Sequence, residues 1–250
     1  MKSFLLAVQF LTVIPLKIRN VNERKLVNSL IYFPVTGLLI GLVLAGLSSV
    51  LFALHFYELT VAIVLVVALA AITGGIHLDG LSDTFDALAS GKDKEKCLEI
   101  MRDSHSGAMG VISIVCALLL KAGFIFSLGL HDYLPALILI CVLSRWSMVS
   151  AIFLFPYARS EGKAGVFMNN INLRIFLLAT GIALVLTLLV WQIKGLLLFI
   201  IAGFVAWLFS KLITRKIGGI TGDTLGAVNE LVEILVLTGV CIIERIWIYG

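Results

Sequence analysis

Three aspartates stand close together in a chain that otherwise carries few charges. Asp79, Asp83 and Asp86 are spaced i, i+4 and i+7, so on a helix their carboxylates project from one face about a turn apart. Like charges placed this way repel, which predicts a cation against that face. Mg²⁺ takes oxygen ligands, usually one or two carboxylates with water and substrate phosphates in the remaining positions. The spacing therefore indicates phosphoryl chemistry, and a merely solvated acidic loop is the alternative.

Two later stretches carry groups that suit phosphate. Residues 101–110 open an apolar run, and Asp103, Ser104 or Ser106 could cap the helix that starts there, whose free N–H groups and dipole favour an anion. Residues 218–230 are glycine-rich and allow close backbone approach, and Asp223 and Glu230 add oxygen ligands. This stretch is not a Walker A motif, because no Gly-Lys-Ser/Thr follows.

The composition is that of an integral membrane protein. The chain has 250 residues, of which 60% are hydrophobic, and a mean hydropathy of +1.10. The formal charge of +4 is small and uneven along the chain, so it bears on membrane orientation and gives no indication of a nucleic-acid partner. The four cysteines lie far apart, without the spacing of a zinc site or a disulfide framework.

The apolar runs predict an all-α bundle of about seven transmembrane helices in one polytopic domain, residues 1–250. Runs long enough to cross about 30 Å of hydrocarbon occupy residues 30–54, 59–76, 108–130, 134–155, 173–191, 196–212 and 227–247. Residues 4–14 are apolar but too short to span, and no signal-peptide cleavage site follows them. They predict an interfacial or re-entrant helix at the N-terminus.

The basic residues predict which face of the bundle is cytoplasmic. If the segment before the first span is cytoplasmic, fourteen lysines and arginines fall on that side and only Lys194 and Arg245 on the other. This bias follows the positive-inside rule, and it places the aspartates and the long connections, the natural sites of catalytic loops, on the cytoplasmic face.

Two charges fall inside predicted spans. Arg145 and Lys121 are costly in hydrocarbon, and such residues usually face the bundle interior or a wet cavity. Arg145, near mid-span, is expected to be a functional cation or the partner of an aspartate. Lys121 is a weaker candidate, because its long stem can snorkel to the interface.

Three motifs stand in order along the chain: Gly74-Gly75-x-His77-x-Asp79-Gly80-x-x-Asp83-x-x-Asp86, Met101-x-Asp103-Ser104-x-x-Gly107-x-x-Gly110, and Gly219-x-Thr221-Gly222-Asp223-x-Leu225-Gly226-Ala227-x-x-Glu230. With Phe10-Leu11-Thr12, Phe33-Pro34, Arg145-Trp146 and Pro156-Tyr157-Ala158-Arg159, they resemble the cobalamin synthase family, also called adenosylcobinamide-GDP ribazoletransferase. The sequence departs from the family pattern at Ala87, often glycine, and at Arg102 and His105, which stand for a basic pair around Asp103.

The resemblance implies a Mg²⁺-dependent transferase that joins adenosylcobinamide-GDP to α-ribazole or its 5'-phosphate, yielding adenosylcobalamin or its phosphate and GMP. It places the enzyme in the bacterial cytoplasmic (inner) membrane, and the oligomeric state, including a homo-oligomer, stays open. It implies metal ligands at Asp79, Asp83, Asp86 and Asp103. For the general base, His77 and a carboxylate such as Asp86 both remain open.

The expected substrate-binding residues include arginines, which hold phosphate bidentately. The full set is Arg102, Ser104, Arg145, Arg159, Gly222, Asp223 and Glu230.

Two other functions are weighed against this one. A lipid phosphotransferase of the CDP-alcohol type also uses spaced aspartates, but the Ala-Arg expected after its first Asp-Gly is absent at Leu81 to Thr84. A metal or corrinoid transporter would place its acidic residues near the bilayer midplane and often shows internal repeats. Here the aspartates fall at the ends of predicted spans.

Overall fold

The structure is a computed structural model that describes residues 2–103, 105–159 and 165–249. Within these ranges it is helical, with one isolated parallel bridge between Tyr157 and Ile220. Its elements are α1 Lys2–Leu11, α2 Glu23–Val27, η1 Asn28–Tyr32, α3 Phe33–Ala53, α4 Glu58–Thr73, α5 Ile76–Ala89, α6 Lys94–Ile100, α7 Ala108–Phe126, η2 Leu130–Asp132, α8 Tyr133–Leu154, α9 Gly165–Asn170, α10 Leu173–Ile217 and α11 Gly222–Tyr249.

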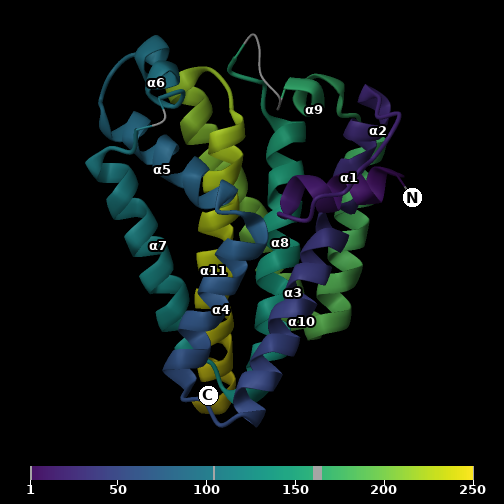
Figure 1. Ribbon diagram of the computed structural model, residues 1–250, viewed down its shortest axis with the longest axis vertical. Helices are drawn as coiled ribbons and strands as arrows, with labels where there is room; N and C mark the ends of the chain where they lie inside the picture. Colours follow the sequence, from purple (N-terminus) through teal and green to yellow (C-terminus); the bar gives the residue numbers. More distant parts are fainter. Residues whose placement is uncertain (1, 104, 160–164, 250) are drawn as a thin grey trace.

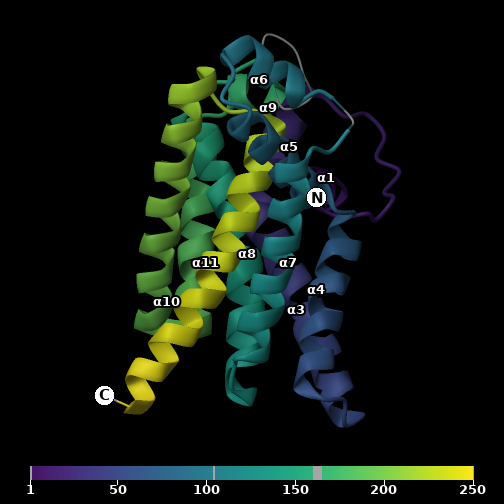
Figure 2. The same cartoon turned by 90° about the vertical axis from the view of Figure 1, so that its left-hand side faces the viewer.

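The long helices pack around α8. Every residue from Ala136 to Ile152 is buried, and α8 contacts α3, α10 and α11 (Figures 1 and 2). On α3, Gly37 and Gly41 lie against the α8 backbone: a Cβ on Gly41 would stand 2.7 Å from the Ile138 Cα, and one on Gly37 would meet the Cys141 carbonyl. Small residues four apart allow this close approach, as they commonly do between membrane helices.

The 45-residue α10 is a helical hairpin. Its backbone leaves helical geometry at Trp191 and Gln192. The Trp146 Nε1 on α8 donates to the Thr180 Oγ1 at 3.0 Å on one side of this break, and its ring stacks on Phe199, 4.0 Å between centroids, on the other. Both arms of α10 therefore lie beside α8, and they correspond to the predicted runs 173–191 and 196–212.

Among the residues that the structure describes, five helices are long and apolar enough to cross a membrane, and six if the bent pair α4 and α5 is one span. This count takes α10 as a single helix. The structure confirms an all-α membrane bundle, whereas a total of seven crossings stays a prediction. α1 is too short to span and lies across the axis of α3, beside η1 (Figure 1).

The connections predicted to share one face do gather at one end of the bundle. Figure 1 shows α2, α6 and α9 at the same end, opposite the C-terminus. Two boundaries differ from the sequence prediction. The run predicted over residues 59–76 ends as α4 at Thr73, with α5 beginning at Ile76, and α11 begins at Gly222 and not near residue 227.

The early start of α11 has a local cause. Thr221 and Thr224 form a reciprocal cap, since the Thr224 N–H donates to the Thr221 Oγ1 at 3.2 Å and the Thr221 N–H donates to the Thr224 Oγ1 at 2.7 Å. Such an exchange satisfies two of the N–H groups left free at a helix start. The glycine-rich stretch is therefore largely the first turns of α11.

Candidate active site

Two successive glycines place the aspartates at the end of the bundle. Gly74 and Gly75 have φ values of +64° and +70°, a left-handed conformation that glycine adopts without steric cost. The chain turns by 90° between α4 and α5, so α5 runs at a steep angle to the long helices near α6 (Figure 1). The polar face of α5, with its three aspartates, therefore lies beside the cytoplasmic connections predicted from the sequence.

Asp86 caps another helix. Its Oδ2 accepts from the Gly107 N–H at 2.7 Å and its Oδ1 from the Gly110 N–H at 2.8 Å. A Cβ on Gly107 would stand 2.5 Å from the Asp86 Oδ1, and one on Gly110 would also collide with the carboxylate. The sequence predicted a cap for α7 from Asp103, Ser104 or Ser106; the structure gives this role to Asp86, because the glycines leave room for a side chain from α5.

Asp83 lies in a strongly negative environment. Asp79 is exposed and Asp83 is partly buried. Burial raises the pKa of Asp83, and the neighbouring charges of Asp79 and Asp223 raise it further, to about 7. Arg159 opposes this shift but does not cancel it. A cation at this position would be favoured, which agrees with the sequence prediction of a cation against this face of α5.

α5 crosses the start of α11 at two glycines. A Cβ on Gly80 would stand 2.5 Å from the Asp223 carbonyl oxygen, and one on Gly226 would stand 3.0 Å from the His77 carbonyl oxygen and 3.2 Å from the Gly80 Cα. The two backbones are thus in direct contact, and larger residues would separate them. This contact brings the first and third sequence motifs into one site.

A short bridge delivers Arg159 to the same place. The Ala158 N–H donates to the Ile220 carbonyl and the Ile220 N–H to the Pro156 carbonyl, both at 2.9 Å. Beyond the bridge, the Arg159 Nη2 donates to the Asp223 Oδ2 at 2.8 Å. The ion pair is partly buried, and it holds the guanidinium beside the aspartates of α5.

These elements enclose a cavity of about 360 Å³. Aromatic side chains from three elements form one wall: Phe10 packs on Phe33 at 5.8 Å and on Phe167 at 5.1 Å between ring centroids. The predicted site residues that line the cavity are His77, Asp79, Arg159, Gly222 and Asp223. A largely apolar cavity with a few charged groups is the usual form of a site for a bulky ligand with a polar end.

Arg145 and Glu230 belong to a separate network inside the bundle. Arg145 is fully buried and pairs with Glu233, while the Lys121 Nζ donates to the Glu230 Oε2 at 2.6 Å and also pairs with Glu233. Neither Arg145 nor Glu230 lines the cavity. The expected aspartate partner of Arg145 is a glutamate, and Lys121 does not snorkel, because two carboxylates hold its ammonium inside.

His77 lies between this network and the cavity. Its side chain is buried, it lines the cavity, and its Nε2 has no hydrogen-bond partner within the described residues. An imidazole nitrogen without a partner can accept a proton from a bound group. The same role suits Asp86 less well, since backbone N–H groups engage both of its oxygens.

The second motif borders the site through Met101, whose carbonyl oxygen accepts from the Arg159 Nη2 at 3.4 Å. Asp103 is exposed and bonds to His105, whose N–H and Nδ1 lie 3.0 Å and 2.6 Å from the Asp103 Oδ1. Hydrogen bonds from His105 lower the pKa of Asp103. Arg102 is also exposed, and Ser104 lies outside the described residues. Arg102 and Asp103 directly follow Met101 in the chain, but neither of them lines the cavity.

The carboxylates suit Mg²⁺ by their chemistry. Among the described residues, no three His, Cys, Asp or Glu side chains are grouped as a ready metal cage. Mg²⁺ needs only one or two carboxylates when water and substrate phosphates complete its shell. Asp79 and Asp83 meet this requirement, and the pKa of Asp83 is raised by its burial and then by the negative charges of Asp79 and Asp223.

Sequence reasoning missed the aromatic wall. Phe10 and Phe33 fell within stretches that carried the family resemblance, but nothing in their spacing placed them beside the aspartates. Phe167, on α9, carried no signal at all. The contact between Phe10 and Phe167 joins segments more than a hundred residues apart, which no local pattern reveals.

The comparisons with known proteins all point to one family. The sequence model of the cobalamin-5-phosphate synthase family matches residues 3–241. The adenosylcobinamide-GDP ribazoletransferase of Desulforamulus reducens is 39% identical over 237 residues, covering 94% of each chain. Those of Caldanaerobacter subterraneus and Roseiflexus sp. are each 40% identical, covering 94% and 92% of this chain and 96% and 86% of their own. No solved structure matches the chain.

Proposed function

The chain belongs to the cobalamin-5-phosphate synthase family, and we propose that it joins adenosylcobinamide-GDP to α-ribazole or its 5'-phosphate. The products are adenosylcobalamin or its phosphate, and GMP. The observation that carries this proposal is the convergence of Asp79, Arg159 and Asp223 on one cavity with an aromatic wall. A pyrophosphate would meet the charged side of this cavity, and an apolar part of either substrate would meet the aromatic side.

The transfer needs a nucleophile, a leaving group and charge neutralisation. A hydroxyl oxygen of the ribazole attacks the phosphorus on the cobinamide side of the pyrophosphate, and the bond from that phosphorus to the GMP oxygen breaks. We assign the hydroxyl proton to the unpartnered His77 Nε2. Arg159, fixed by Asp223 at 2.8 Å, would hold a phosphoryl oxygen, and such positioning accounts for most of the catalysis in phosphoryl transfer.

Mg²⁺ is part of the proposal. Asp79 and Asp83 would hold it beside the cavity, where it would neutralise charge on the pyrophosphate oxygens. The negative environment that raises the pKa of Asp83 supports this assignment. Asp86 and Asp103, the other two predicted ligands, have partners of their own in Gly107, Gly110 and His105.

The test is product formation by the purified protein in detergent. Given adenosylcobinamide-GDP, α-ribazole and Mg²⁺, the wild type should form adenosylcobalamin, and EDTA, Asp79→Asn or Asp83→Asn should abolish it. Glu99→Gln, an exposed carboxylate on α6, should leave the rate unchanged. His77→Gln should lower kcat and leave KM nearly unchanged, if His77 takes the proton. No product from a folded wild type would overturn the proposed function.

We also propose that the active face is cytoplasmic in a bacterial inner membrane. The positive-inside bias supports it, and α5, which carries the aspartates, lies toward the end of the bundle opposite the C-terminus (Figure 1). Alkaline phosphatase, which folds outside the cytoplasm, should be active when fused after α11 and inactive when inserted at Gly91 between α5 and α6. The reverse pattern would contradict this orientation.

A further inference from the structure

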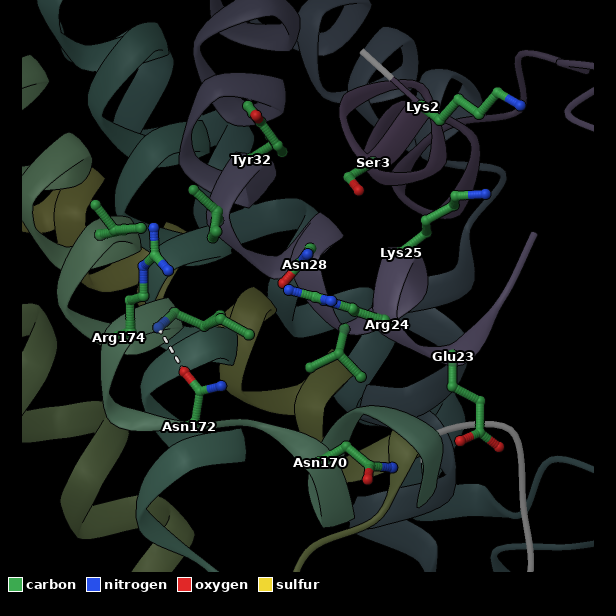
Figure 3. A pocket seen from close by; sticks show the side chains of 14 residues that line it. Lys2, Ser3, Glu23, Arg24, Lys25, Asn28, Tyr32, Asn170, Asn172 and Arg174 are labelled. Carbon is green, nitrogen blue, oxygen red and sulfur yellow. Dashed lines mark hydrogen bonds between the residues drawn. The ribbon is translucent and has the colours of Figure 1, made fainter. Parts of the chain in front are cut away.

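A second, larger cavity lies away from the candidate active site. It has a volume of about 770 Å³ and opens between α1, α2, η1 and the first turns of α10. Four cationic side chains line it, Lys2, Arg24, Lys25 and Arg174, against a single carboxylate, Glu23 (Figure 3). It shares no lining residue with the 360 Å³ cavity, so the proposed reaction does not account for it.

The two arginines are the groups available to a ligand. The Lys25 Nζ donates to the Asn20 carbonyl at 2.6 Å and the Lys2 Nζ to the Arg19 carbonyl at 3.4 Å. The guanidinium groups of Arg24 and Arg174, by contrast, have no hydrogen bond or ion pair with any residue that the structure describes. In Figure 3, Arg24 reaches into the middle of the view beside Asn28, and Arg174 stands on the opposite wall. Guanidinium groups placed like this suit a phosphate.

An apolar groove continues from this cavity along α10. Leu178 lines both the basic cavity and a groove of about 370 Å³ that also includes Gly181, Ile182 and Val185. A Cβ on Gly181 would meet nothing within 4 Å, so this glycine widens the groove. Val185 lies about 16 Å along the helix from Arg174, at 1.5 Å per residue.

The position of the cavity matches the membrane interface. Arg174 stands in the first turn of α10, and Leu177 and Leu178 in the next turn are 56% and 44% exposed on a helix apolar enough to span. These leucines mark the side that faces hydrocarbon. The cations therefore lie at headgroup level, and the groove lies at the level of the acyl chains.

We propose that this cavity and groove together bind one anionic phospholipid. The phosphate lies between Arg24 and Arg174, and one acyl chain follows α10 past Gly181. The shared chemistry would also admit a free phosphate group, but a soluble phosphate needs no apolar groove. Basic pockets between membrane helices on the cytoplasmic side bind anionic headgroups by the same charge attraction.

The experiment measures lipid retention by native mass spectrometry of the detergent-purified protein. Titrated with phosphatidylglycerol and, separately, phosphatidylcholine, the wild type should retain one phosphatidylglycerol in preference. The double variant Arg24→Gln/Arg174→Gln should bind phosphatidylglycerol about tenfold or more weakly, since each basic side chain near an anionic lipid contributes several-fold. Arg215→Gln, an exposed arginine at the other end of α10, should bind it as the wild type does.

Two further measurements distinguish a bound lipid from a bound free anion. Gly181→Leu fills the groove and keeps both arginines, so it should weaken phosphatidylglycerol binding. Millimolar inorganic phosphate should not displace the lipid from the wild type. Equal retention of the two lipids, or full retention by the double variant, would overturn the site. Displacement by inorganic phosphate, with no effect of Gly181→Leu, would replace the lipid with a free anion. Circular dichroism and gel filtration confirm that each variant is folded.

Discussion

At the scale of single residues, Asp83 shows how one carboxyl can be destabilised by its neighbours. It lies on α5, which turns away from the spanning α4, and it is near Asp79 and Asp223. In the absence of a cation, folding brings these charges together, and the protonated form of Asp83 is favoured up to about pH 7. Its stability contribution therefore depends on pH.

The sign of this dependence is fixed by linkage. The folded pKa of about 7 exceeds the ordinary value of 3.8, so the folded state binds more protons between these values and loses stability as pH rises through them. With EDTA present, Asp83→Asn should raise the Tm relative to the wild type, and the difference should grow from pH 4 to pH 7 and then level off. Thermal unfolding followed by circular dichroism measures it.

The matched control for this prediction is Glu99→Gln, which removes an exposed carboxylate from α6. Its Tm difference from the wild type should not follow the same course between pH 4 and pH 7. If the Tm of Asp83→Asn tracked the wild type at every pH, the negative environment of Asp83 would be refuted.

Sequence spacing predicted part of this arrangement. Periods of four and three residues placed Asp79, Asp83 and Asp86 on one helical face, and the helix exists. The same spacing could not show that Asp86 has a different task, since its partners Gly107 and Gly110 lie 21 and 24 residues further on. Asp86 thus caps α7, although its spacing in the sequence makes it look equivalent to Asp79 and Asp83.

At the scale of elements, the start of α7 depends on α5. A carboxylate at a helix N-terminus satisfies free N–H groups and interacts favourably with the helix dipole. Here that carboxylate is Asp86, and it joins the first two sequence motifs into one unit. Loss of the cap should therefore loosen the connection that carries α6.

Asp86→Ala should lower the free energy of unfolding by about 1–2 kcal/mol, the usual loss for a capping side chain with dipole support. Chemical denaturation in detergent measures this change, and faster proteolysis within residues 90–107 should accompany it. Ser106→Ala, which removes a hydroxyl beside the helix start without touching the cap, is the control. A variant as stable as the wild type but inactive would instead assign Asp86 to the chemistry.

Contacts between elements were the part least accessible from sequence. The glycines at 80 and 226 suggested close backbone approach, yet only the structure shows that the two positions approach each other. The bridge at Tyr157 and Ile220 joins residues 63 apart, and a single paired residue leaves no strand pattern. Arg159 and Asp223 were each predicted as substrate-binding residues, but the ion pair between them was not predicted.

At the scale of the whole molecule, a charge network ties three spans together. Lys121 on α7, Arg145 on α8 and Glu233 on α11 meet inside the bundle, with Glu230 as the second carboxylate. Buried pairs add little net stability, but removing one partner leaves an uncompensated charge. We therefore expect the network to favour the correct assembly of the spans more than it adds to their net stability.

Lys121→Met should destabilise the folded protein by about 3–5 kcal/mol, the usual result of breaking a buried pair. The double variant Lys121→Met/Glu230→Gln removes one charge of each sign and should recover most of this loss. Unfolding midpoints in mixed micelles, together with yields from the membrane fraction, measure both effects. Equal loss in the single and double variants would show that the charges do not compensate one another.

Hydropathy predicted the class of this molecule, since it is a property of long segments, whereas the orientation that the charge bias indicates stays a prediction. Hydropathy does not reveal partners: Lys121 was a weaker candidate because its long stem can snorkel, but two glutamates hold its ammonium inside the bundle. The α10 hairpin was foreseen as two runs because Gln192 and Lys194 interrupt the apolar sequence. Only the structure shows that both runs pack against α8, through the contacts of Trp146 with Thr180 and Phe199.

The buried network also has a consequence for biosynthesis. α11 carries Glu230 and Glu233, and a carboxylate near the middle of a span raises the free energy of membrane insertion by about 2.5–3.5 kcal/mol. The chain is made from its N-terminus, so Lys121 and Arg145 are already in the bilayer when α11 leaves the ribosome. α11 can therefore insert beside Lys121 and Arg145, which pair with its two glutamates. The order of synthesis thus lowers the free energy of inserting a segment that carries two carboxylates.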